Sequence, residues 1–319
     1  MNQKEILVFG ATGQIGRSLI RKLTKNNYKV LAVTRNIHQK GYRLKTQGNP
    51  GYLEIFEIKS FNETNIRKLM KGCHACINLI GILNEDRKNE FFKVHSELPG
   101  LISKIANEEE VNQFIHMSSL GIEIVENSNY AKSKLDGENI VRSNFKNSII
   151  IKPSIVFSVD DNFTTQFMSL FNFLPAIPLY YSGNTRFTPI HVSDLTEIIL
   201  NLINKNITNL TLECIGPEVL TFKQILSKLL KATKKKRVLF PLPYPLAKLS
   251  AKIFQILPKP LITEDQLNLL KYDNIVSGKY KTNIDLSLNP TKNFENEIKK
   301  YAYNWTSGGQ FSNQINNSD

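Results

Sequence analysis

The sequence has little cysteine and no long hydrophobic stretch. Three cysteines in 319 residues, Cys73, Cys76 and Cys214, are too few for a disulfide framework and favour a reducing compartment. No stretch approaches the roughly 18 consecutive apolar residues that a bilayer-spanning helix needs, so no transmembrane segment is predicted. The first strand is expected within a few residues of Met1, which leaves no room for a signal or transit peptide. Together these absences predict a cytoplasmic protein.

Signatures of metal and nucleic-acid binding are also missing. The segment Cys73-His74-Ala75-Cys76 suits a zinc or redox site, but no second ligand pair accompanies it and Cys76 lies in an apolar run. Core packing is therefore the favoured interpretation, and no metal site is predicted. The net charge of +13 suits an anionic partner such as a nucleotide phosphate, an acidic protein or a lipid surface. No zinc-finger or RNA-binding motif accompanies this charge, so nucleic acid is not predicted as a partner.

The most informative segment lies near the start of the chain. An apolar run over residues 6–9 is followed by three glycines spaced three apart and then by a segment with helical periodicity. A strand, a glycine turn and a helix in this order form a cradle for the pyrophosphate of a dinucleotide, with the helix N-terminus facing the anion. The predicted cofactor-binding residues of the turn are Gly10, Thr12, Gly13, Gln14, Ile15 and Gly16. The alternative is an ordinary glycine-rich loop.

Strands and helices alternate after this turn, which predicts an α/β protein with a Rossmann-type doubly wound parallel sheet and helices on both faces. Further strands are predicted at residues 28–34, 52–58, 75–80 and 113–119, and helices near 66–70, over 91–109 and from 130. We place the nucleotide-binding domain at residues 1–155, with residues 185–215 as a candidate extension of its sheet. A smaller mixed lobe is placed at 156–305, with helices over 162–173 and after Thr221. Residues 306–319 are predicted to be a disordered tail.

Arg35, at the end of the second predicted strand, bears on the nature of the nucleotide. A carboxylate normally stands at this place and binds the adenosine ribose hydroxyls. An arginine can instead pair with a 2′-phosphate through its planar guanidinium, so the sequence favours NADP(H) over NAD(H). Lys40, Arg43 and Lys45 are weaker candidates for the same contact. The alternative is a solvated arginine at a strand end.

Asn78 and Gly81 close the fourth predicted strand and are assigned to the cofactor site. A glycine at this position lets the backbone pass close to the ribose and nicotinamide side of a dinucleotide. Folds of this kind often carry an aspartate against the adenine just after the third strand. This chain has Lys59 and Ser60 there, so the adenine contact is left unassigned.

A candidate catalytic group consists of Ser119, Tyr130 and Lys134. Tyr130 and Lys134 are one helical turn apart and reach the same side of their helix. A tyrosine with its ordinary pKa of about 10 is a poor base at neutral pH, and a lysine close by favours the phenolate, so Lys134 is both a catalytic and a cofactor-binding candidate. Ser119 would hold the substrate oxygen. The alternative is a chance pair on an exposed helix, and His116, inside the fifth strand, is interpreted as a packed residue.

These motifs, in this order, resemble those of the extended and atypical short-chain dehydrogenase/reductases of the NAD-dependent epimerase/dehydratase type. The resemblance rests on Gly10-x-x-Gly13-x-x-Gly16, Asn78-x-x-Gly81, Ser118-Ser119 and Tyr130-x-x-x-Lys134, and extends to residues 150–157 and 188–195. It covers most of the chain. It implies a bound nicotinamide dinucleotide and an active site in the cleft between the sheet domain and the smaller lobe.

Within this family the chain is similar to the nucleotide-binding accessory subunits of respiratory complex I and their bacterial relatives, through residues 114–121, 151–163 and 240–243. The likeness implies an NADP(H)-binding accessory or assembly subunit with a largely structural nucleotide, placed peripherally on the cytoplasmic face of the inner membrane. Residues 234–257 combine a Lys-Lys-Lys-Arg run with a lysine-bearing apolar stretch, which suits docking on an anionic membrane surface or an acidic subunit. The alternative is a lysine-rich loop followed by a helix that covers the second lobe.

A second function stays open beside the first. The chain could be an active NAD(P)-dependent oxidoreductase or epimerase that uses Tyr130, Lys134 and Ser119 on a carbonyl, sugar-nucleotide or quinone-like substrate. The intact tyrosine–lysine pair favours this activity. Only ten residues separate Ser119 from Tyr130, fewer than in typical sugar epimerases, and Ser158 stands where a glycine is usual. Such a short loop fits a protein that has kept its cofactor and has reduced or lost its turnover.

Overall fold

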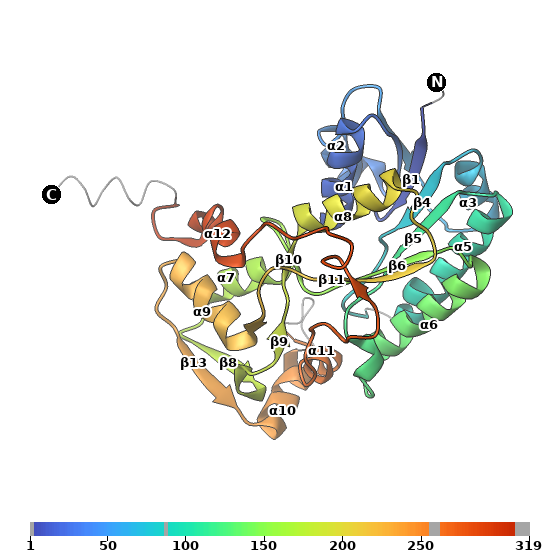
Figure 1. Ribbon diagram of the computed structural model, residues 1–319. Helices are drawn as coiled ribbons and strands as arrows, with labels where there is room; N and C mark the ends of the chain where they lie inside the picture. The colour runs from blue at the N-terminus through green and yellow to red at the C-terminus, as the bar shows by residue number, and fades with distance from the viewer. Residues whose placement is uncertain (1–2, 86–88, 255–261, 310–319) are drawn as a thin grey trace. The chain divides into compact units, whose positions relative to one another are not determined.

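The computed structural model of the chain describes residues 3–85, 89–254 and 262–309 (Figure 1). Backbone contacts divide the chain into two compact units. Unit 1 comprises Met1–Pro153, Val192–Cys214 and Gly278–Leu288. Unit 2 comprises Ser154–His191, Ile215–Ser277 and Asn289–Asp319. Each unit is thus assembled from segments that are far apart in the sequence.

Unit 1 is built on a parallel sheet whose strands follow the order β14-β11-β6-β5-β4-β1-β2-β3. The bounds of these strands are β1 Glu5–Phe9, β2 Lys29–Thr34, β3 Leu53–Glu57, β4 Ala75–Asn78, β5 Gln113–Met117, β6 Ile149–Pro153, β11 Leu210–Cys214 and β14 Lys281–Thr282. The order reverses between β1 and β4, which is where doubly wound sheets bind their ligands. The predicted doubly wound parallel sheet is confirmed, and β11 and β14 extend it beyond β6.

Helices cover both faces of this sheet, as predicted. α1 (Gln14–Lys25) packs on α8 (Val192–Asn204) on one face, while α3 (Glu63–Met70), α5 (Leu98–Glu108) and α6 (Asn129–Asn144) cover the other (Figure 1). The shorter helical segments of unit 1 are η1 Ile37–Gly41, α2 Tyr42–Lys45, α4 Glu90–Phe92, η2 Lys93–Glu97 and η3 Ile122–Ile124. The core under α3, α5 and α6 includes both Cys73 and Cys76, so these thiols are packing residues of unit 1.

The single helix predicted over residues 91–109 is divided into three segments. The π-helical η2 separates α4 from α5, and Pro99 stands in the first turn of α5. Proline has no N–H to donate to the carbonyl four residues before it, here that of His95, so a regular α-helix cannot run through this point. The same carbonyl packs against α6, where a Cβ on Gly137 would lie 1.8 Å from the oxygen. The glycine therefore allows α6, which carries Tyr130 and Lys134, to approach η2 closely.

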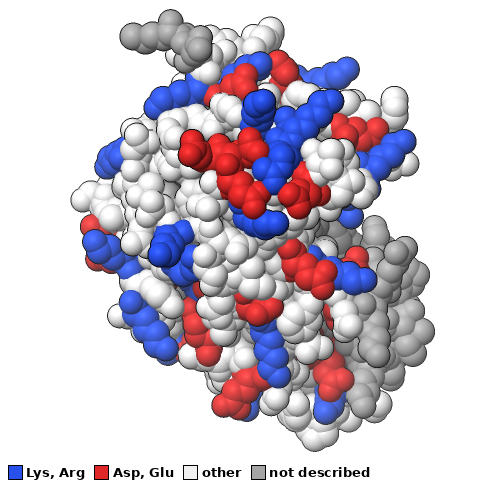
Figure 2. Space-filling view, turned by 90° about the vertical axis from the view of Figure 1, so that its right-hand side faces the viewer, with Lys and Arg blue, Asp and Glu red and all other residues white. Residues whose placement is uncertain are grey.

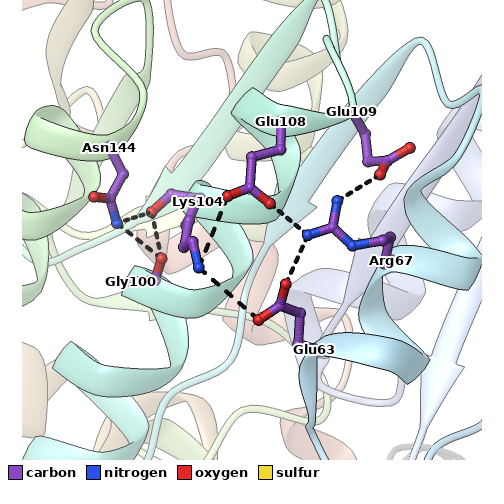
Figure 3. A network of polar contacts seen from close by, with 8 residues as sticks. Glu63, Arg67, Gly100, Lys104, Glu108, Glu109 and Asn144 are labelled. Carbon is purple, nitrogen blue, oxygen red and sulfur yellow. Dashed lines mark hydrogen bonds and ion pairs between the residues drawn. The ribbon is translucent and has the colours of Figure 1, made fainter.

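An ion-pair network joins α3 to α5 at the surface of unit 1 (Figure 3). The guanidinium of Arg67 lies 2.7 Å from Glu63 and 2.7 Å from Glu109, and it also contacts Glu108. Lys104 lies 3.9 Å from Glu63 and 3.8 Å from Glu108. Because these side chains are partly exposed, the network contributes modestly to stability and mainly fixes the spacing of the two helices. Figure 2 shows a face on which acidic and basic side chains are similarly intermixed.

Unit 2 contains three two-stranded sheets within its described residues. Their strands are β7 Val156–Phe157 with β10 Ile190–His191, β9 Arg186–Phe187 with β12 Leu220–Thr221, and β8 Ala176–Tyr180 with β13 Val238–Leu242. The helices are α7 Thr164–Phe173, α9 Phe222–Ala232, α10 Tyr244–Phe254, α11 Glu264–Leu269 and α12 Phe294–Lys299, with shorter turns η4 Tyr181–Gly183 and η5 Ala302–Trp305. The predicted helices over 162–173 and after Thr221 are confirmed, and Thr221 forms a capping box with Gln224. The core of this unit is rich in phenylalanine and leucine.

Two predicted segments fall only partly within the described residues. Of residues 234–257, the described part forms β13 and α10, and 255–257 lie outside it. Of the predicted tail, residues 310–319 lie outside it as well. Among the helices that the structure describes, none is both long enough and apolar enough to cross a bilayer.

Candidate functional site

The glycine turn lies between β1 and α1 at the carboxyl edge of the sheet. Gly10 has a φ of +77°, and the N–H of Gly13 donates to the carbonyl of Gly10 at 3.0 Å. A Cβ on Gly10 would lie 2.8 Å from the carbonyl carbon of Leu79, just after β4. Only glycine fits this combination of positive φ and close backbone contact. Gly16, in the first turn of α1, packs against the carbonyl of Gly10, so the predicted strand, turn and helix are formed.

The N-terminus of α1 is suited to an anion. The helix begins at Gln14 after a glycine that offers no capping side chain, and no acidic residue lies in its first turn. The backbone N–H groups of Gln14, Ile15 and Gly16 belong to the helix end, where the dipole favours negative charge. Arg17 donates a hydrogen bond to the carbonyl of Thr12 and adds a positive charge beside the turn. This arrangement can hold a pyrophosphate.

The end of β4 is shaped by the buried side chain of Asn78. Its carboxamide oxygen accepts a hydrogen bond from the N–H of Ile80 at 3.1 Å, and its nitrogen lies 3.2 Å from Nδ1 of His116 on β5. These contacts fix the backbone that leads to Gly81, so Asn78 supports the predicted cofactor site from inside the protein. His116 is fully buried, and burial lowers its pKa to about 3. His116 is packed as predicted, but its buried Nε2 has no hydrogen-bond partner among the described residues, so the histidine is not fully satisfied.

Several chain segments meet around Lys134. This side chain is buried, and its Nζ donates to the carbonyl of Met117, at the end of β5, at 3.0 Å. A Cβ on Gly81 would lie 3.4 Å from Lys134 Nζ and 3.6 Å from His95 Nε2, so the three residues lie together. Burial lowers the pKa of Lys134 to about 8, and the carboxylate of Glu138 opposes this shift. Lys134 is therefore positively charged at neutral pH, but its pKa lies not far above that pH.

Tyr130 lies one turn before this lysine, and aromatic neighbours hold its ring. The ring stands edge-on to His95 at 5.3 Å and to Phe91 at 5.7 Å between centroids. His95 Nε2 accepts from the N–H of Ile82 at 3.0 Å, which places the imidazole proton on Nδ1, 3.0 Å from Ser133 Oγ. Ser133 donates in turn to the carbonyl of Tyr130 at 2.9 Å. Burial lowers the pKa of His95 to about 2, so this histidine stays neutral and positions Tyr130.

The two serines at the end of β5 differ in environment. Ser118 is buried, and its hydroxyl donates to the carboxylate of Glu138. Ser119 is half-buried. Successive side chains of an extended segment point to opposite sides, so the two hydroxyls lie in different environments. Ser119 stays the predicted catalytic serine, because the hydroxyl of Ser118 is engaged in the interior.

A buried ion-pair network lies beside Lys134. Lys152 on β6 is fully buried, with its Nζ 2.7 Å from Glu138 and in contact with Glu123. The ring of Tyr280 lies 5.5 Å from the same ammonium group. The positive charges of Lys134 and Lys152 are thus balanced by the carboxylates of Glu123 and Glu138. Because Glu138 is on α6, the network ties this helix to β6.

Arg35 lies directly after β2, with an exposed side chain. β1 separates β2 from β4, so the structure does not bring Arg35 to the residues around Lys134. Glu57, at the end of the neighbouring β3, accepts a hydrogen bond from the N–H of Ile37 at 3.1 Å. A carboxylate at this edge suits ribose hydroxyls better than a 2′-phosphate, so Glu57 opposes the NADP(H) preference expected from Arg35. The side chain of Lys40, a weaker candidate, lies outside the described residues.

Sequence reasoning missed His95, Glu138 and Lys152. Glu138 had a local signal, because it follows Lys134 by four residues on the same helix face. His95 and Lys152 reach the site from other elements, and no local pattern marks them. They could be found only once the register of β5 against β6 and the path of η2 were known.

Comparisons with known proteins agree with this geometry. The profile of a family described as the NAD dependent epimerase/dehydratase family matches residues 6–211. The mitochondrial NADH dehydrogenase (ubiquinone) 1 alpha subcomplex subunit 9 of Mus musculus is 29% identical over 307 residues, covering 94% of this chain and 81% of the relative. The mitochondrial NADH-ubiquinone oxidoreductase 40 kDa subunit of Neurospora crassa is 25% identical over 300 residues, covering 93% of this chain and 77% of the relative.

The fold itself is shared with a solved enzyme. UDP-glucuronic acid 4-epimerase from Bacillus cereus, determined with UDP-glucuronic acid and NAD, superposes with a TM-score of 0.70 at 17% identity, covering 94% of this chain and 99% of that chain. The family match spans more than half of the sequence and contains the glycine turn, Asn78 and Gly81, and the Tyr130–Lys134 pair. The chain therefore belongs to the NAD dependent epimerase/dehydratase family.

Proposed function

We propose that this chain binds a nicotinamide dinucleotide at the carboxyl edge of the unit 1 sheet and serves as an accessory or assembly subunit of respiratory complex I. The observation that carries the proposal is the similarity to the Mus musculus and Neurospora crassa subunits across 94% and 93% of this chain. This similarity includes unit 2 as well as the nucleotide-binding turn. Proteins related only through a shared nucleotide-binding fold would not need to be similar in unit 2.

The residues at the sheet edge fit the cofactor. The turn from Gly10 to Gly16 would hold the pyrophosphate at the N-terminus of α1, and Gly81 and Lys134 would face the ribose and nicotinamide. The nicotinamide, when bound, supplies hydride chemistry. Its proposed role in a subunit is largely structural: a ligand present at 100 times its dissociation constant would add about 2.7 kcal/mol to the free energy of unfolding.

Co-migration tests the subunit assignment. Membranes solubilised with a mild detergent and separated on a native gel should show this chain in the band with NADH:quinone oxidoreductase activity. A Gly10→Val variant should enter that band in reduced amount, because it loses the bound nucleotide and its stabilisation. The matched Gly72→Val change, at a φ of +79° with an open Cβ position, controls for backbone strain alone and should reduce it less. Chain found exclusively in the free fraction would contradict the proposal.

Two finer assignments belong to the same proposal. The proposed nucleotide is NADP(H), because the exposed guanidinium of Arg35 follows β2, where a 2′-phosphate would lie, although the carboxylate of Glu57 at the end of β3 favours NAD(H). The protein is peripheral on the cytoplasmic face of the inner membrane, an assignment supported by its net charge of +13. Fractionation with a high-salt wash tests the second point, since a peripheral protein held by charge is released by salt and an integral one is not.

The alternative function is an active NAD(P)-dependent oxidoreductase or epimerase acting on a carbonyl, sugar-nucleotide or quinone-like substrate. The observation that favours it is the positioning of Tyr130 by His95, next to a buried and charged Lys134. A cation beside the phenol favours the phenolate, which can accept or return a proton at the substrate oxygen. Tyr130→Phe should abolish turnover of a carbonyl substrate and leave NADPH binding intact. Absence of turnover in the wild type with a broad carbonyl panel would favour the subunit role.

A further inference from the structure

The basic charge of the sequence is unevenly distributed. From residue 219 to residue 263 the chain has ten basic residues and no acidic one. The ten are Lys223, Lys228, Lys231, Lys234, Lys235, Lys236, Arg237, Lys248, Lys252 and Lys259. This segment thus accounts for +10 of the net charge of +13 and leaves +3 for the remaining 274 residues, since 319 minus 45 is 274.

The same segment exposes large apolar side chains. Leu246 and Leu249 on α10 are 54% and 56% exposed, and they share one helix face because they are three residues apart. Ala247, on the opposite side of the helix, is buried. Both faces of this part of α10 are therefore apolar, which is unusual for a helix that borders water. Val238, at the start of β13, is 64% exposed.

Exposed apolar and basic groups also lie together at the start of β13. The N–H of Val238 donates to the carbonyl of Pro175, so this end of the strand lies beside the end of α7, where Phe173 is 83% exposed. Arg237 Nε donates to the carbonyl of Phe171 at 2.8 Å, which fixes the basic run against the same helix. No ion pair involving Lys235 or Lys236 is found in the part of the chain that the structure describes.

Three other lysines of the segment form ion pairs. Lys228 and Lys231 lie 3.0 Å and 3.2 Å from Glu295, and Lys248 lies 3.1 Å from Glu264. Lys235 and Lys236 of the basic run before β13 therefore carry charge that no described ion pair balances. We define the docking surface as two parts of unit 2: Phe173, Lys235, Lys236 and Val238 at the start of β13, and Leu246 and Leu249 on α10, which follows β13.

We propose that this docking surface binds an anionic lipid bilayer, with Leu246, Leu249, Val238 and Phe173 in the headgroup and upper acyl region and Lys235 and Lys236 on the lipid phosphates. Lysines next to exposed leucine and phenylalanine side chains are typical of interfacial membrane contacts. Protein interfaces are instead depleted in lysine, which disfavours an acidic protein as the occupant. The inference deepens the proposed peripheral location and rests on it.

Vesicle co-sedimentation of the full chain tests the proposal without complex I or nucleotide. The wild type should bind vesicles of phosphatidylglycerol and phosphatidylcholine and should bind pure phosphatidylcholine far more weakly. Each lysine near an anionic surface contributes about 1 kcal/mol, or roughly five-fold in affinity, so Lys235→Gln/Lys236→Gln should weaken binding roughly 25-fold at low salt. Lys25→Gln/Lys146→Gln, which removes two exposed lysines of unit 1, should change it little.

A second variant tests how much the apolar side chains contribute to vesicle binding. Leu246→Ser/Leu249→Ser should weaken binding at least about ten-fold at both low and high salt, because transfer of leucine into an apolar phase is not screened by ions. The effect of the lysine changes should fade at high salt. All four side chains are exposed or half-buried, and circular dichroism of each variant verifies that it is folded.

Three outcomes would overturn the inference. The wild type fails to sediment with anionic vesicles, or it sediments equally with neutral ones. The Lys235→Gln/Lys236→Gln variant binds like the unit 1 control. The chain ignores vesicles but binds polyglutamate through the same lysines, which would identify an acidic protein as the partner. None of these outcomes bears on co-migration with complex I, so failure of the docking inference and failure of the proposed function can be told apart.

Discussion

Replacing Lys152 with methionine removes the ammonium group that lies 2.7 Å from Glu138 and leaves that carboxylate buried. The side chain of Lys152 is 0% exposed and that of Glu138 is 7% exposed, so water cannot replace the lost partner. Breaking a buried pair by removing one member typically costs about 3–5 kcal/mol. Glu138 keeps its hydrogen bond from Ser118 and the attraction of Lys134, so we expect the low end, a loss of about 3 kcal/mol in the free energy of unfolding.

A double-mutant cycle separates the pair from its surroundings. Glu138→Gln should cost a similar amount, because it leaves Lys152 with Glu123 alone and Lys134 without its nearby carboxylate. The double variant Lys152→Met/Glu138→Gln buries fewer unmatched charges than either single change. Its cost should therefore fall about 2 kcal/mol short of the sum of the single costs, within the range of coupling for residues in contact.

Urea unfolding followed by circular dichroism measures these free energies. Lys146→Met, which removes an exposed lysine of unit 1, is the matched control and should lie within about 0.5 kcal/mol of the wild type. Single changes at Lys152 and Glu138 that behave like the control would refute the reasoning. Strict additivity in the double variant would also refute it, because it would mean that the two charges do not interact in solution.

The remaining predictions concern single residues of unit 1. Arg35→Ala should weaken NADPH binding about ten-fold or more, as expected for loss of a charged hydrogen bond, and leave NADH binding almost unchanged in fluorescence titrations; equal losses would rule out the NADP(H) preference. Lys134 has a pKa of about 8 when folded and about 10.4 when unfolded, so the unfolded state binds more protons between these values. Stability should therefore rise by about 3 kcal/mol as pH increases through that window, and urea unfolding of Lys134→Met should lack this rise. Gly10→Ala should abolish binding of either nucleotide, because its φ is +77° and a Cβ would lie 2.8 Å from Leu79; Gly72→Ala, at a φ of +79° with open space, is the control for backbone strain alone. Loss of binding in both glycine variants would contradict the steric argument.

Local rules explain why part of the site was predictable from the sequence. The glycine turn and the Tyr130–Lys134 spacing depend on contacts within a few residues, and the strands and helices around them follow from apolar periodicity. Pro99 was visible as well, but its effect on the carbonyl four residues earlier matters only because α6 packs there through Gly137. The break at η2 therefore depends on tertiary packing that the sequence pattern does not contain.

Residues whose role depends on partners from other elements could not be predicted from the sequence. Lys152 is a charged residue within an apolar strand. A buried lysine is tolerated only if a carboxylate inside the protein pairs with it. Its partners Glu138 and Glu123 lie on a helix and a turn, 14 and 29 residues before Lys152 in the sequence. The role of Glu57 also depends on a tertiary contact, because its carboxylate accepts a hydrogen bond from the N–H of Ile37 in the loop after β2. The sequence pattern does not contain this contact. The position of Glu57 weakens the argument from Arg35 and makes the paired NADPH and NADH titrations decisive.

The distribution of charge connects the two proposed binding surfaces. Residues 1–60, which contain the glycine turn and Arg35, carry 11 basic and 3 acidic residues, a net charge of +8. Residues 219–263 carry +10, so the rest of the chain must carry −5 to give the total of +13. A general preference for lysine would not leave the remaining 214 residues with an acidic excess, since 319 minus 60 minus 45 is 214. Two separate anionic ligands explain the pattern better than one, with a nucleotide phosphate on unit 1 and lipid phosphates on unit 2. Salt should therefore weaken vesicle binding in the Gly10→Ala variant as much as in the wild type, because that change affects only the first of the two ligands.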